Sequence, residues 1–111
     1  MLLLFGDDDT WCKPAYAKHM MKILNERDDP SLSQRYLALS NTGHCPNHEA
    51  PQAVAHALSR WVSSKNRMNL AVVDGPTTWQ EKWGTITMRE VKDDEFDDLS
   101  ASDRLMIRML A

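Results

Sequence analysis

The chain has few cysteines, no excess of basic residues and no long hydrophobic run, and each absence excludes a class of protein. Its two cysteines are too few for a disulfide framework and are typical of a reducing compartment. The net charge of −3 argues against a nucleic-acid partner, which favours a basic face. The apolar run Leu2–Phe5 is far too short to span a membrane, and no basic residues precede it as in a signal peptide.

The length and composition are those of one small soluble domain, or of part of one. The hydrophobic fraction of 42% and the charged fraction of 26% are ordinary for a globular protein. A chain of 111 residues holds one compact domain at most.

The first 64 residues predict the order β-α-β-α. The apolar run Leu2–Phe5 is typical of a strand buried on both faces. Pro14 suits the first turn of a helix that ends by Asn25, and Arg35–Leu39 is a second β-type run. A further helix follows from about Pro51. Two strands separated by a helix are expected to lie parallel, with a right-handed crossover.

Apolar stripes predict which faces these two helices bury. The spacing is that of residues one and two turns apart on a helix. The stripes are Tyr16, Met20, Ile23 and Leu24 on the first helix, and Val54, Ala57, Leu58, Trp61 and Val62 on the second.

Residues 65–111 predict a small C-terminal extension made of a hairpin and a helix. Leu70–Val73 and Thr85–Val91 are the candidate strands, and Ile86 and Met88 would share one face of the second. The sequence thus divides into residues 1–64 and an extension of residues 65–111.

The last part of the extension combines an acidic run with a short helix. Residues 93–98 are mostly acidic and are interpreted as a solvated loop, with a turn also expected at Asp28–Ser31. Ser102 is a candidate cap for the final helix, on which Leu105 and Met109 would be stacked.

Loops that follow the two predicted strands carry an acid and a histidine. If the strands are parallel neighbours, their carboxyl ends open on the same side, so Asp9 would lie near His44. A carboxylate that accepts the Nδ1–H of histidine fixes its tautomer and leaves Nε2 free to take a proton. The alternative is that the aspartates and His44 are ordinary solvated loop residues.

Metal binding is the rival interpretation of the same loops. His44, Cys45 and His48, with Cys12 from the neighbouring loop, offer a Cys2His2 zinc set. This spacing fits no standard finger, and adjacent histidine and cysteine are awkward ligands for one tetrahedral ion. We therefore expect no metal and no organic cofactor. His19 and His56 are interpreted as surface or packing residues.

The two loop motifs resemble those of the α/β-hydrolases. The segment Leu3–Trp11 resembles the seventh-strand segment of that family, where a strand ends in Gly-x-x-Asp and the aspartate is the triad acid. The segment Asn41–Pro51 resembles the segment after the eighth strand, where a Gly-His pair carries the catalytic histidine. Its form, Gly-His-Cys-Pro-x-x-Glu-x-Pro, is most similar to the plastid pheophytinase-like group.

This resemblance covers residues 1 to about 64 and implies a role for each matched residue. Asp9 would be the triad acid, with Asp8 as the alternative if the loop register is off by one, and His44 would be the general base. Trp11 matches a frequent aromatic of the family, although packing against the sheet edge suits it equally. The resemblance further implies the last two strands of an α/β-hydrolase sheet, a small hydrophobic ester substrate and a plastid location.

The nucleophile of that family is missing from these 111 residues. The elbow Gly-x-Ser-x-Gly lies upstream of both motifs in the family, and no two of the four glycines here are four residues apart. No His-Gly oxyanion segment is present either. We expect a C-terminal fragment of a carboxylic-ester hydrolase that is inactive alone, as would follow if Met1 were an internal methionine taken as a start.

Two alternatives stay open at this point. An aspartate nucleophile would make the parent protein an epoxide hydrolase or a dehalogenase. Alternatively, the chain is a non-catalytic interaction module that self-associates through the exposed edge of Leu2–Phe5.

Overall fold

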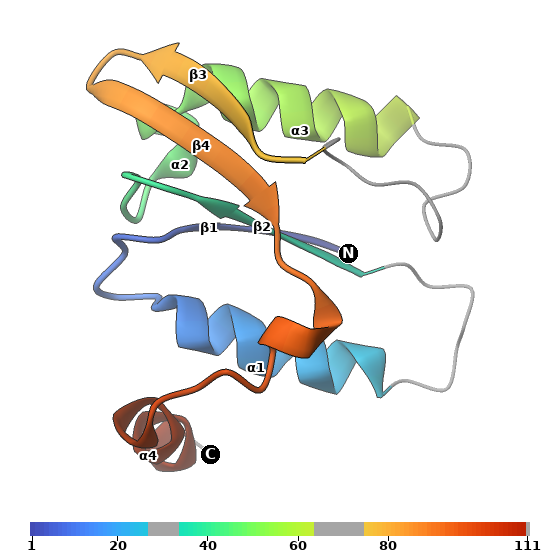
Figure 1. Ribbon diagram of the computed structural model, residues 1–111, viewed down its shortest axis with the longest axis vertical. Helices are drawn as coiled ribbons and strands as arrows, with labels where there is room; N and C mark the ends of the chain where they lie inside the picture. Colours follow the sequence, from blue (N-terminus) through green and yellow to red (C-terminus); the bar gives the residue numbers. More distant parts are fainter. Residues whose placement is uncertain (27–33, 64–74, 111) are drawn as a thin grey trace.

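A four-stranded sheet forms the centre of the molecule, and a computed structural model describes residues 1–26, 34–63 and 75–110 of it (Figure 1). The strand order is β1-β2-β4-β3. The strands are β1 (Leu2–Gly6), β2 (Arg35–Leu39), β3 (Thr77–Glu81) and β4 (Gly84–Glu90). β1 and β2 are parallel, whereas β4 is antiparallel to both β2 and β3. The architecture is therefore mixed α/β.

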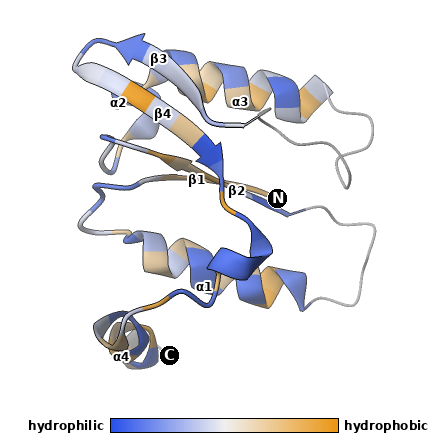
Figure 2. Cartoon of the chain, in the orientation of Figure 1, coloured by the Kyte–Doolittle hydropathy of each residue, from blue (hydrophilic) through white to orange (hydrophobic). Residues whose placement is uncertain are grey.

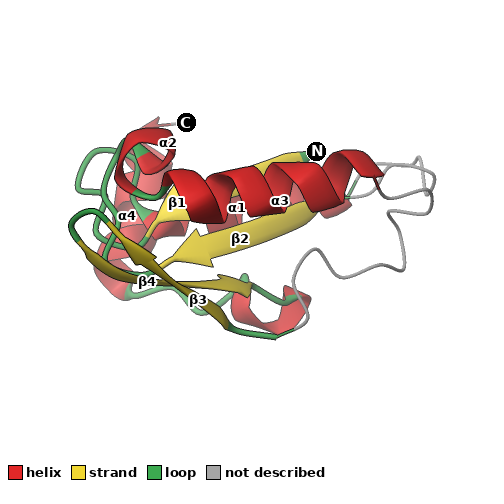
Figure 3. Cartoon of the chain, turned by 90° about the horizontal axis from the view of Figure 1, so that it is seen from above, coloured by secondary structure: helices red, strands yellow, loops and turns green. Residues whose placement is uncertain are grey.

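The helices cover both faces of this sheet. They are α1 (Pro14–Asn25), the short α2 (Pro46–Glu49), α3 (Pro51–Ser63) and α4 (Ala101–Leu110), with a 3-10 turn η1 (Asp93–Glu95) before α4. Figures 1 and 3 show α3 on one side of the sheet and α1 on the other. Within the described ranges, each helix is too short or too polar to cross a lipid bilayer.

The strand β2 lies at the centre of the fold because its side chains pack on both faces. Leu37 and Leu39 are fully buried on the side of α3, together with Ala53 and Ala57 of that helix. Tyr36 and Ala38 are buried on the side of α1. The parallel pairing of β1 with β2, in register from Leu2↔Arg35 to Gly6↔Leu39, confirms the prediction made from the β-α-β order.

The buried face of α1 agrees with the predicted stripe at Leu24 but differs from it at Met20 and Ile23. Ala17, Met21 and Leu24 pack on the sheet, whereas Met20 and Ile23 are exposed. Both sets recur at helical spacing, so the sequence pattern alone does not choose between them. Small Ala17 allows α1 to lie close to the sheet, and this turns Met20 and Ile23 away from it.

The predicted stripe on α3 is correct in part. Ala57 is buried, and Val54 and Trp61 pack partly buried against the same core. Leu58 and Val62 are exposed instead, with 47% and 71% of their surface accessible. Figure 2 shows hydrophobic residues alternating with polar ones along α3, as expected for a helix with one covered side.

One strand of the C-terminal hairpin is the predicted one, and its partner in the structure is a strand that was not predicted. β4 confirms the strand expected over Thr85–Val91, and Ile86 and Met88 are both buried on it. Its partner is β3, which was not predicted, while Leu70–Val73 and the turn at Asp28–Ser31 lie outside the described residues. The hairpin extends the sheet at the β2 edge. The division into residues 1–64 and 65–111 stays a prediction.

The acidic segment after β4 is a docked element and not simply a solvated loop. Phe96 is buried against α1, with only 3% of its surface exposed. Glu95 pairs with Arg89 of β4, and Asp97 pairs with Lys22 of α1. The segment therefore fastens the end of the hairpin to α1.

The final helix begins two residues earlier than its predicted cap, Ser102, implies, because Ser100 is the capping residue. The Ser100 hydroxyl, and not that of Ser102, accepts the Asp103 N–H at 3.1 Å, and the Asp103 carboxylate accepts the Ser100 N–H at 3.3 Å. Leu105 and Met109 are mostly exposed on α4.

Candidate functional site

The loops that follow β1 and β2 are joined by backbone contacts. The Asp7 N–H donates to the Leu39 carbonyl at 2.8 Å, and the Asp8 N–H donates to the Thr42 carbonyl at 2.9 Å. A Cβ placed on Gly6 would lie 2.2 Å from the Thr42 carbonyl oxygen, which is a clash with backbone. Only glycine at position 6 therefore allows the two loops to approach this closely.

Asp9 is a buried carboxylate held by the start of its own loop. Its residue surface is 8% exposed. Oδ1 accepts the backbone N–H groups of Trp11 at 2.8 Å and of Cys12 at 2.9 Å. Oδ2 is then directed across to the second loop, where it lies 2.9 Å from Nδ1 of His44. The structure thus brings Asp9, and not Asp8, into contact with His44.

The environment of Asp9 favours its ionised form. Burial acts to raise the pKa of the carboxyl, but the N–H of Cys12, the His44 ring and the N–H of Trp11 together outweigh it. The pKa of Asp9 therefore lies below its ordinary value, and the group is a carboxylate at neutral pH. A carboxylate at this position accepts the Nδ1–H of His44 and fixes the other ring nitrogen, Nε2, as the free acceptor.

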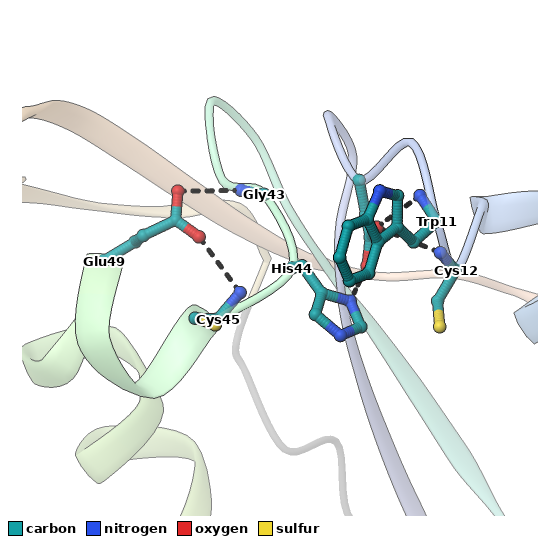
Figure 4. A network of polar contacts seen from close by, with 7 residues as sticks. Trp11, Cys12, Gly43, His44, Cys45 and Glu49 are labelled. Carbon is teal, nitrogen blue, oxygen red and sulfur yellow. Dashed lines mark hydrogen bonds and ion pairs between the residues drawn. The ribbon is translucent and has the colours of Figure 1, made fainter.

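His44 is half-exposed at the end of the sheet, with 50% of its side chain accessible. Figure 4 shows the Trp11 ring beside the imidazole, and their ring centres are 5.4 Å apart. Trp11 itself is 78% exposed, so it lies against His44 and not in a packed sheet edge.

Glu49 holds the His44 loop and is a residue whose role the sequence interpretation missed. Its two carboxylate oxygens accept the backbone N–H of Gly43 at 3.0 Å and of Cys45 at 3.1 Å (Figure 4). These are the residues directly before and after His44. The only signal for this role was the position of the glutamate in the Gly-His-Cys-Pro-x-x-Glu motif.

Two hollows adjoin the His44 ring. One, of about 380 Å³, lies between the loops and includes Trp11 and Cys45 among its lining residues. The other, of about 180 Å³, is lined on one side by Leu4 and Phe5 of β1. Asp9 and His44 border both hollows, so a bound molecule could reach the imidazole from either side.

The four-ligand zinc set that was the rival interpretation of these loops is not assembled. His48 packs against Trp83, with ring centres 5.1 Å apart, and Cys45 is exposed. In the part of the chain that the structure describes, the ligand side chains that do meet are Asp9, Cys12 and His44, whose candidate ligand atoms all lie within 4.8 Å of one another. His56, interpreted as a surface or packing residue, lies against Trp79 of β3, with ring centres 5.3 Å apart and ring planes tilted by 56°.

Comparison with known proteins finds a similarity over part of the chain. The chain is 30% identical over 60 residues to "Pheophytinase, chloroplastic" of Arabidopsis thaliana, an α/β-hydrolase. The matched region is 54% of this chain and 11% of that protein, so the chain spans about a ninth of its relative. No family model matches the sequence, and no solved structure matches the fold. The similarity suggests a fragment of the hydrolase family, and the mixed α/β sheet agrees with this in general terms.

Proposed function

We propose that these residues form the acid and general-base part of an α/β-hydrolase that cleaves carboxylic esters. The observation that carries the proposal is the 2.9 Å contact between Asp9 Oδ2 and His44 Nδ1 at the carboxyl ends of adjacent parallel strands. Strand ends of this kind are where α/β proteins place their chemistry. The similarity to a pheophytinase supports the same reaction class.

In this mechanism His44 transfers a proton, and Asp9 orients the imidazole ring and stabilises its protonated form. Nε2 of His44 takes the proton from a nucleophilic hydroxyl as that group attacks the ester carbonyl. The Asp9 carboxylate stabilises the imidazolium that forms, and His44 then returns the proton to the departing alcohol. No Gly-x-Ser-x-Gly elbow occurs in the sequence, so the hydroxyl must be supplied by residues outside these 111.

A hydrophobic ester is the substrate class that the surroundings of His44 support. The larger hollow is bordered by the exposed indole of Trp11, and the smaller by Leu4 and Phe5. These side chains offer apolar surface on both sides of the imidazole, while the backbone N–H groups of Trp11 and Cys45 are engaged by Asp9 and Glu49.

Ester hydrolysis by two forms of the protein tests the proposal. The 111 residues alone should not turn over a p-nitrophenyl ester. In a protein that carries them together with the nucleophile, His44→Ala or Asp9→Asn should lower kcat/KM by about 10⁴-fold, because the base is lost or held in the wrong tautomer. Asp8→Asn is the matched control and should change kcat/KM less than twofold. Equal losses for Asp8→Asn and Asp9→Asn would contradict the assignment, as would turnover by the isolated chain that disappears in His44→Ala.

A second candidate function is interaction through the free side of β1. Among the described strands, β1 pairs on one side only, with β2. On α3, His56 lies against Trp79 of β3, the strand at the other end of the sheet from β1. Leu58 is turned by about 160° around the helix from His56, so it is directed away from β3. On α1, Met20 is likewise turned by about 160° from Lys22, which pairs with Asp97 in the segment after β4, whereas Ile23 is turned from Lys22 by about 100°.

Met20 of α1 and Leu58 of α3 are thus exposed apolar side chains on the sides of their helices opposite Lys22 and His56. An uncharged strand edge of this kind is a template for a further strand. We propose that in the full hydrolase this edge pairs with the next strand of the sheet, and that the isolated chain pairs it with a second copy.

A further inference from the structure

We propose that Asp9, Cys12 and His44 form a binding site for a thiophilic divalent cation, with Zn²⁺ as the ion that fits best. A carboxylate oxygen, a thiol sulfur and an imidazole nitrogen converge there, all within 4.8 Å of one another. Zn²⁺ binds these three ligand types at about 2.0–2.3 Å, which places tetrahedral ligands about 3.5 Å apart. A closing movement of about 1 Å by the side chains would therefore complete the site.

The backbone already ties two of these ligands together. The N–H of Cys12 donates to Oδ1 of Asp9 at 2.9 Å, so the thiol is carried by a residue whose position depends on the carboxylate. Oδ2 of the same carboxylate contacts the His44 ring. Asp9 is thus the centre of the set, because one of its oxygens binds the backbone of Cys12 and the other contacts the ring of His44.

All three residues border the smaller hollow, which has room for an ion. Its volume of about 180 Å³ exceeds the roughly 30 Å³ that one water occupies, so a cation and a water in its fourth position would fit. The rest of its lining includes Leu4, Phe5 and Pro46, which offer no competing side-chain ligands. Such a site has three protein ligands and one open position.

The donor set also selects against the common hard cations. Mg²⁺ and Ca²⁺ prefer oxygen ligands throughout, and this site offers one carboxylate beside a thiol and an imidazole. A thiolate and a carboxylate together neutralise the two charges of Zn²⁺. Binding would release the thiol proton, so affinity should increase with pH.

An ion at this site would prevent His44 from acting as a base. If Nε2 binds the metal, the nitrogen that would accept the proton is occupied. If Nδ1 binds it, the proton of the neutral ring moves to Nε2. Metal binding and ester hydrolysis would therefore exclude one another. The metal site needs no ester chemistry, however, and it stands or fails independently of the proposed function.

Titration of the isolated chain with Co²⁺ tests the site directly, because cobalt replaces zinc and is coloured. We expect one equivalent to produce the visible bands of four-coordinate cobalt together with a near-ultraviolet sulfur-to-cobalt charge-transfer band. One equivalent of Zn²⁺ should then remove both signals, and a large excess of Mg²⁺ should leave them unchanged.

The two cysteines of the chain provide a matched pair of variants. Cys12→Ser should abolish the charge-transfer band, whereas Cys45→Ser should retain it, because exposed Cys45 lies outside the set. Asp9→Asn and His44→Ala should each weaken Co²⁺ binding at least tenfold, and circular dichroism establishes that each variant is folded. Loss of the band in Cys45→Ser, or its persistence in Cys12→Ser, would overturn the proposal, as would the absence of any charge-transfer band in the folded wild-type chain.

Discussion

The carboxylate of Glu49 binds the backbone N–H groups of the residues directly before and after His44. It accepts the N–H of Gly43 and of Cys45, the two neighbours of the histidine, at 3.0 and 3.1 Å. Asp9 holds the ring itself, so the backbone and the side chain of His44 are fixed by different carboxylates. Glu49 is therefore a positioning residue.

Removing this carboxylate should loosen the loop that carries His44. Glu49→Ala leaves two N–H groups without their charged acceptor, and we expect a loss of about 1–3 kcal/mol in the free energy of unfolding. Hydrogen exchange should accelerate at the Gly43 and Cys45 amides more than elsewhere. Glu26→Ala, at the exposed end of α1, is the control and should leave both amides protected as in the wild type. Unchanged exchange in Glu49→Ala would contradict the positioning role.

A methyl group at position 6 should separate the two site loops. In Gly6→Ala the new Cβ would lie 2.2 Å from the Thr42 carbonyl oxygen, so backbone must move, and we expect a cost of about 1–3 kcal/mol. Gly43→Ala is a milder comparison, because its Cβ would meet the Glu49 carboxylate at 3.3 Å. Urea unfolding should rank the two variants in that order, and a larger loss for Gly43→Ala would contradict the close approach at Gly6.

Acid should release the docked segment after β4. The hydrogen bond and charge of Lys22 hold the pKa of Asp97 below its ordinary value of 3.8, although burial opposes this. A lowered folded-state pKa means that the stabilisation is present above about pH 3.8 and is lost as the pH falls through the folded value. In Asp97→Asn the melting temperature should be lower than that of the wild type at neutral pH, and the two should converge in strong acid. A difference that persists there would show that Asp97 acts through something other than its charge.

The isolated chain should self-associate through the β1 edge. We expect light scattering at micromolar concentration to give the mass of a dimer or larger species. Like charges at two exposed positions of the helices, in Met20→Lys with Leu58→Lys, should repel between copies and shift it toward the monomer. The same charges at Leu105 and Met109, which are also exposed apolar residues but lie on α4, serve as the control. A wild-type monomer with a cooperative melt would contradict this interface.

The sequence was sufficient to predict the parts of the site that depend on strand order. Two apolar runs separated by a helix implied parallel strands, and parallel strands place Asp9 and His44 at the same edge. The sequence does not predict that Glu49 binds the backbone beside His44. This contact depends on how the short helix α2 directs its last residue, Glu49, back toward Gly43.

The other differences between the sequence predictions and the structure, at β3, α1 and Cys12, also have local causes. β3 was missed because its edge position leaves alternate residues polar and its run Thr77–Glu81 holds little that is apolar. On α1, the stripe that contains Met20 and the stripe that contains Met21 have the same helical spacing. Only packing against the sheet determines that Met21 is the buried one. Cys12 joins Asp9 through a backbone hydrogen bond, which no spacing in the sequence predicts.

The protonation of the His44 ring tests the central claim most directly. In the metal-free chain, kept so with a chelator, the nitrogen-15 shifts of the ring at neutral to basic pH report which nitrogen carries the proton. We predict the Nδ1–H form in the wild type and in Asp8→Asn, and a shift toward Nε2–H in Asp9→Asn. A wild-type ring protonated at Nε2, or one that responds equally to both aspartate variants, would contradict an Asp9–His44 acid–base pair.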